Sequence, residues 1–159
     1  MKIKNIVFTL LAPFVVLYRV FASPPAGLVV SNTAGSFEGA AINRFVTTAF
    51  TVPNLVAGVG TTAGRDIAPC AATGVVPLGF VPETGAVGDA LGVLMGYGDA
   101  VLAVASAAVA ADVPVYTATG GKLSSTGGTG KYLMGRSGSA AAAANDEFVV
   151  IPCPPVLQP

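Results

Sequence analysis

The sequence predicts an all-β protein, a small β-barrel or β-tulip-like domain with at most one short helix, preceded by an extended N-terminal arm. Three observations favour this fold class. The chain of 159 residues is long enough for one ordinary domain with an extension. After the first 26 residues it consists of short runs rich in Val, Thr, Tyr and Phe, separated by Gly, Pro, Asn and Asp, which is typical of strands joined by turns. No internal repeat of fixed period is present, which argues against solenoids and propellers.

The first 22 residues form an apolar segment that permits three interpretations. Lys2, Lys4, the apolar run after them and Val20-Phe21-Ala22 resemble a secretory signal with its cleavage site, but Arg19 interrupts the run. A transmembrane helix fits poorly, because Ile6–Tyr18 is only thirteen residues long and contains Pro13, against the roughly 20 residues that span a bilayer. The third interpretation, which we favour, is an arm that buries its apolar side chains against a partner.

The arm and its hinge occupy residues 1–26, and the β-rich domain occupies residues 27–159. The hinge is placed at Ser23–Gly27 because neither Pro24 nor Pro25 can continue a helix. The side chains expected to form the subunit or partner interface all lie on the arm: Ile6, Phe8, Leu11, Phe14, Leu17, Tyr18 and Arg19.

Seven strands and one short helix are predicted after the hinge. The strands are Gly27–Ser31, Arg44–Val52, Gly74–Val81, Ala90–Met95, Val113–Ala118, Lys131–Gly135 and Glu147–Pro152. The Ala-rich stretch Ala100–Ala111 is the candidate helix. Ser137–Asn145 is a turn of small residues, and the prolines of Pro152–Pro159 are expected to end the sheet.

The low charge of the chain predicts an assembly component. Hydrophobic residues make up 53% of the chain and charged residues only 10%, whereas a soluble domain carries roughly 25% charged residues. So few charges cannot cover a free monomer, and we expect much of the surface to be buried against other subunits. The net charge of zero argues against a nucleic-acid partner. The absence of histidine excludes Ser-His-Asp and Cys-His mechanisms within one chain and removes imidazole as a metal ligand.

The motifs that resemble chemical sites have simpler explanations. The run Gly127–Lys131 lacks the spacing of a phosphate-binding loop and leads into a strand, so a β-hairpin loop is expected there. Asp89, Asp99 and Asp112 follow glycine or alanine, where an aspartate side chain usually bonds turn amides. Tyr97, Tyr116 and Tyr132 have no basic cluster beside them, so core or interface packing is expected rather than base stacking. No catalytic residue, cofactor, metal or small-molecule substrate is expected.

The two cysteines, Cys70 and Cys153, leave two alternatives open. A disulfide would close a loop of more than eighty residues and stabilise the fold by about 4–5 kcal/mol in the chain-entropy model. Buried, reduced thiols are the other alternative and are the usual state in a cytosol.

The order of glycines and strands in the last two thirds of the chain resembles a known family. The segments that carry the resemblance are Gly74–Val81, Gly88–Val93, Ala111–Ala118, Gly121–Leu123, Tyr132–Ser137 and Ala143–Val150. Together they are similar to the small head decoration, or cement, proteins of tailed bacteriophages. Ala111-Asp112 stands where Gly-Asp is usual in that family, and Arg136-Ser137 where Arg-Ala is usual. The resemblance covers about residues 65–152.

The resemblance implies a structural protein, not an enzyme, that sits as a homotrimer on the exterior of the capsid in the virion after assembly in the host cytoplasm. Its partners would be the major capsid protein and further copies of itself, with no membrane. The N-terminal 65 residues depart from the short pattern of the family and fit an arm that reaches neighbouring capsid subunits. The alternative is an exported bacterial surface or adhesion β-protein, whose N-terminus is a cleavable signal and whose cysteines pair.

Overall fold

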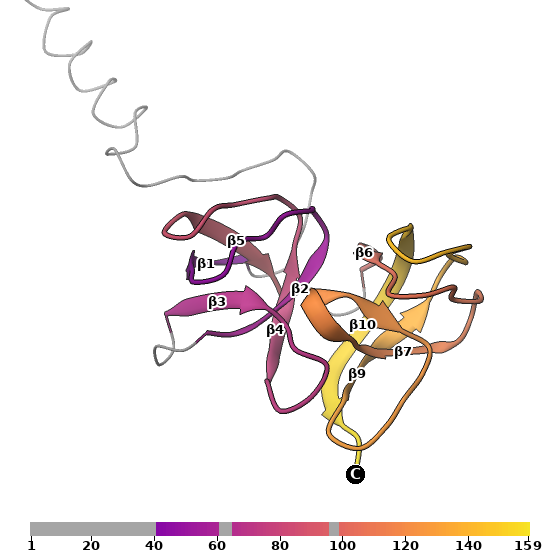
Figure 1. The fold of residues 1–159 in the computed structure, drawn as a ribbon. Coiled ribbons are helices and arrows are strands. Elements are labelled where there is room, and N and C mark those ends of the chain that lie inside the picture. Colours follow the sequence, from indigo (N-terminus) through magenta and orange to yellow (C-terminus); the bar gives the residue numbers. More distant parts are fainter. Residues whose placement is uncertain (1–40, 61–64, 96–98) are drawn as a thin grey trace, which may run out of the picture. The chain divides into compact units, whose positions relative to one another are not determined.

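The computed structural model describes residues 41–60, 65–95 and 99–159 (Figure 1). These residues form ten strands and one three-residue 3-10 turn, η1, which confirms the all-β fold class with a barrel. The strands are β1 (Ala41–Val46), β2 (Leu55–Val59), β3 (Asp66–Pro69), β4 (Pro77–Val81), β5 (Ala90–Leu94), β6 (Val101–Val104), β7 (Pro114–Thr117), β8 (Leu123–Ser124), β9 (Tyr132–Ser137) and β10 (Glu147–Leu157); η1 is Thr119–Gly121. The arm and the predicted strand Gly27–Ser31 lie outside the described residues.

The first five strands form a closed barrel in the order β1-β3-β2-β4-β5 (Figure 1). β1 pairs with β3 in parallel and closes the barrel by pairing antiparallel with β5. The other neighbours are antiparallel. Closure leaves no free sheet edge in the barrel. Its apolar core contains Val46, Phe50, Leu55, Ala57, Ile67, Val81, Leu91 and Val93.

The last five strands form a second sheet in the order β6-β10-β9-β7-β8, which we call the curled sheet. Its two ends approach each other, because Ala105 after β6 forms a parallel bridge with Leu123 of β8. The Ser106 amide donates to the Leu123 carbonyl oxygen over 2.8 Å. The curl wraps the sheet around Phe148, Val150, Met134 and Val115, all of which are buried.

The barrel and the curled sheet share apolar clusters. Val56 of β2 and Phe80 of β4 belong to the cluster of the curled sheet, and Val104 of β6 belongs to that of the barrel. β2 is buried from Leu55 to Gly58, so it is covered on both of its faces. A strand covered on both sides has an uninterrupted apolar sequence, as Leu-Val-Ala-Gly-Val does here.

Several predicted elements were wrong. Ala100–Ala111 contains β6 and turns in place of a helix, because Val101 and Ala103 point into the core while Leu102 between them is exposed. That alternation has the period of a strand, not of a helix. β2, β3 and β8 were not predicted, and β1 ends at Val46, well short of Val52. Among the described residues, no helix is long and apolar enough to cross a bilayer.

One predicted loop and one predicted end of the sheet also differ from the structure. The run Gly127–Lys131 does not close a hairpin: β8 and β9 both pair with β7, on its opposite sides. The tail from Pro152 does not end the sheet, since β10 continues to Leu157. Its register shifts between Pro152 and Val156, so the two prolines between them occupy an irregular stretch where no ladder amide is required.

Candidate functional site

The interface residues predicted from the sequence, from Ile6 to Arg19, lie outside the described residues. Within the described part of the chain, a groove lies on the outer face of the curled sheet. It has a volume of about 400 Å³. Strands β7, β9 and β10 and the turn before β7 supply its walls: Asp112, Pro114, Leu133, Gly135, Arg136, Ile151, Pro152 and Cys153.

Strand register brings the groove residues together from distant parts of the sequence. Ile151 of β10 lies opposite Arg136 of β9, and Arg136 lies opposite Pro114 of β7. Directly opposed residues of antiparallel strands share a face of the sheet. On β10, Ile151 is 52% exposed, whereas Val150 beside it is buried in the core. The outer face therefore carries apolar side chains on three adjacent strands.

Gly135 allows β9 and β10 to lie close together at the centre of the groove. A Cβ atom at this position would collide with the Ile151 carbonyl oxygen, and its φ of 152° is one that other residues rarely adopt. The β7–β9 register also shifts here, between Val115 and Tyr116. The groove thus lies where both strand pairings of β9 are irregular, which is the usual place for a sheet to change curvature.

An ion pair forms the polar side of the groove. Arg136 Nη2 lies 2.9 Å from Asp112 Oδ1. The same nitrogen also donates to the backbone oxygen of Asp112 over 2.6 Å. Asp112 has a φ of 58°, a turn conformation that Asp tolerates better than most residues. Both side chains are largely exposed, and such pairs stabilise a fold by only about 0–1 kcal/mol. The pair fixes the position of two opposite charges on an otherwise apolar face.

Both cysteines are free thiols. Cys153 is partly buried in the wall of the groove, and its burial raises the pKa of the thiol. Cys70 is fully buried between the barrel and the curled sheet, and burial raises its pKa to about 12. Its thiol donates to the Ala71 carbonyl oxygen over 3.3 Å. Neither thiol is poised for nucleophilic chemistry near neutral pH, because the thiolate is the reactive form.

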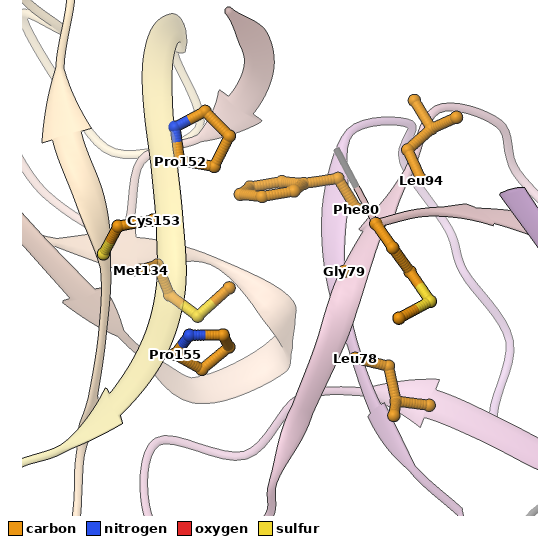
Figure 2. Close-up of a pocket in the computed structure, with 9 residues that line it drawn as sticks. Leu78, Gly79, Phe80, Leu94, Met134, Pro152, Cys153 and Pro155 are labelled. Atoms are coloured by element: carbon orange, nitrogen blue, oxygen red, sulfur yellow. The ribbon is translucent and has the colours of Figure 1, made fainter. Parts of the chain in front are cut away.

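A second, much smaller cavity separates β4 and β5 of the barrel from β10 (Figure 2). The ring of Phe80 points across it towards Pro152. Its volume of about 10 Å³ is at the lower limit for one water molecule. The cavity is a packing defect between two apolar surfaces, and it is too small for a ligand.

Several carboxylates and lysines in the described part of the chain bond to turns and loops. Asp89 accepts a hydrogen bond from the Ala86 amide, as expected for a turn. Asp146 accepts from the amides of Ala142 and Ala143, which fixes the turn before β10. Lys122 and Lys131 donate to Asn145 and to the Thr126 carbonyl oxygen. No three described His, Cys, Asp or Glu side chains lie close enough together to hold a metal ion.

One cation of the barrel is partly buried. Arg44 of β1 lies opposite Leu91 of β5, so its side chain begins on the inner face of the barrel, and its Nε is buried without a hydrogen-bond partner among the described residues. A single guanidinium without a second polar group is not a ligand site.

Sequence reasoning did not find the groove. Its residues come from three separate segments, and the prolines around Cys153 predicted the end of the sheet. Only the alternation of Phe148, Val150 and Pro152 with Val149, Ile151 and Cys153 indicated an outer apolar row. Compared with known proteins, the chain matches no family model, and no curated protein shows significant similarity to it.

Proposed function

We propose that the protein is a structural decoration, or cement, protein that binds the outer surface of a bacteriophage head and stabilises its shell. Its partners are the major capsid protein and further copies of itself, in a homotrimer, and it carries no catalytic site. The observation that carries this proposal is the resemblance of residues 65–152 to capsid decoration proteins.

The positions of the resembling residues in the fold support the proposal. The Asp112 turn, the Arg136 strand and the Asp146 turn all lie in the curled sheet, and Arg136 bonds directly to Asp112. Two motif residues separated by 24 positions in the sequence are thus one structural unit. Because Arg136 and Asp112 bond to each other, their joint occurrence in the motif is better evidence of a shared fold than isolated identical residues are.

The surface of the described domain also favours a role in an assembly. Large apolar side chains are exposed on both sheets and in loops, among them Phe45, Val76, Val87, Leu102, Ile151, Val156 and Leu157. Few charged groups surround them, since charged residues make up 10% of the chain. A surface with so few charges and so many exposed apolar side chains favours association.

We assign capsid attachment to the arm of residues 1–26. Its apolar side chains are too many to leave in water, and each one that is buried contributes roughly 1.5–3 kcal/mol. Lys2, Lys4 and Arg19 would fix the register of the contact by pairing with acidic groups of the capsid.

The test mixes the full chain, and a chain without residues 1–22, with undecorated heads of the phage that encodes it. We expect the full chain to sediment with the heads and to raise the temperature at which they break open. The shortened chain, shown to be folded by circular dichroism, is expected to stay in the supernatant. Undiminished binding of the shortened chain contradicts the role of the arm, and failure of the full chain to bind contradicts the decoration function.

The signal-like sequence of residues 1–22 supports one alternative, an exported bacterial surface or adhesion protein. Export predicts that the native protein begins at or near Ser23 and is recovered from the cell envelope. N-terminal sequencing of the native protein separates the two functions, because a virion protein with a working arm retains residues 1–22.

A further inference from the structure

We propose that the groove on the outer face of the curled sheet is the surface through which copies of this chain contact one another. The proposal names the face that holds an oligomer together, and it does not depend on whether that oligomer binds a capsid.

The apolar part of the groove belongs to a wider apolar face. Leu102 of β6 lies opposite Val149 of β10, and Ile151 lies two residues further along the same face of β10. Leu102 and Ile151 are each about half exposed. Leu133 and Pro114 extend this face across β9 and β7. Apolar side chains thus lie on four of the five strands of the sheet, as the centre of a subunit interface requires.

The charges of the groove select a second copy as the occupant. Arg136 and Asp112 are the two charged residues that line the groove, and they present one positive and one negative group side by side. When the same face is repeated around a symmetry axis, Arg136 of each copy can meet Asp112 of the next, so every charge keeps an opposite partner. A nucleic acid would instead require a cluster of cations, and a strongly charged partner of one sign would meet a pair that is neutral in total and would be repelled by one of its two members.

Cys153 provides a direct probe of this face. Its partly buried thiol lies in the groove wall, whereas Cys70 is fully buried in the core. A maleimide therefore reports the covering of the groove at Cys153 and the integrity of the fold at Cys70, within one molecule.

The first measurement uses the wild-type full chain over a dilution series. Native mass spectrometry gives the oligomeric state, and mass spectrometry of peptides gives the rate of alkylation of each thiol. We expect Cys153 to react slowly where the oligomer is populated and faster as the protein dissociates, while Cys70 stays unreactive throughout. A chain that remains monomeric, or a Cys153 rate independent of association, overturns the proposal.

The second measurement introduces a charge into the groove. Ile151→Lys places a cation opposite Arg136 and is expected to raise the dissociation constant of the oligomer by at least about tenfold. Val87→Lys is the matched control, since Val87 is more exposed than Ile151 and lies in the loop between β4 and β5. It should leave association unchanged. The proposal is overturned if the two variants associate equally, whether or not both associate more weakly than the wild type.

The arm is the competing contact, and its removal distinguishes the two. A chain without residues 1–22 should still associate and should still protect Cys153. Loss of association on this deletion overturns the proposal. If Ile151→Lys makes Cys70 reactive, that variant is unfolded, and the wild-type dilution series then decides alone.

Discussion

At the scale of the single residue, the buried thiol of Cys70 links stability to alkaline pH. Burial raises its pKa from 9.0 to about 12 in the folded state. The stability that the protonated thiol contributes is therefore complete below about pH 9 and is lost as the pH rises towards 12. Over that range the free energy of unfolding should fall by at most about 1.4 kcal/mol per pH unit because of this group. Urea denaturation at a series of pH values measures the slope.

The control replaces the thiol by a group that does not ionise. Cys70→Ala is expected to be less stable at pH 8, because a buried side chain is truncated, and to have a shallower slope above pH 9. The matched variant Cys153→Ala should reduce the slope less than Cys70→Ala does, since Cys153 is only partly buried. An unchanged slope in Cys70→Ala would show that other groups control the alkaline loss.

At the scale of the element, Ser137 of β9 holds the start of β7 in place. Its buried hydroxyl accepts from the Val113 amide over 2.9 Å and donates to the Ala110 carbonyl oxygen over 2.7 Å. Ser137→Ala leaves that amide without its partner, at a cost of about 1–3 kcal/mol in the free energy of unfolding. The exposed Ser125 is the control, and Ser125→Ala should change stability by no more than about 0.5 kcal/mol. Chemical denaturation checks both; equal stability of the two variants contradicts this role.

The elements that could be predicted from the sequence are those with local signals. Val113–Ala118 and Ala90–Met95 were predicted nearly at their true bounds, because β-branched residues alternate in the first and Leu91 and Val93 alternate with small residues in the second. The alanines around β6 predict a helix because alanine favours helices, and packing of Ala103 in the core overrides that preference. The length of β10 was missed because prolines usually end strands, and here the register shift accommodates them. The groove depends on register between three segments, which no local pattern specifies.

At the scale of the whole molecule, the barrel and the curled sheet are joined by polar as well as apolar contacts. The buried Thr117 hydroxyl of β7 donates to the Ala72 carbonyl oxygen over 2.8 Å and accepts from the Tyr132 amide over 3.0 Å. The Gly121 amide donates to the Cys70 carbonyl oxygen over 2.8 Å. Because Val56 and Phe80 of the barrel also complete the core of the curled sheet, neither half can keep its core buried alone. We therefore expect residues 41–159 to unfold in one cooperative transition.

Thr117→Val tests this cooperation. Valine keeps the shape of threonine but leaves the Ala72 carbonyl and the Tyr132 amide without their hydroxyl partner, which should lower the free energy of unfolding by about 1–3 kcal/mol. If barrel and curled sheet unfold together, the slowest-exchanging amides of both should show the same opening free energy, and the substitution should lower both by the same amount. Native-state hydrogen exchange, read separately for β1–β5 and for β6–β10, gives the two values. A fall confined to the curled sheet would mean that the barrel keeps its structure without it, and that the shared core does not couple the two halves.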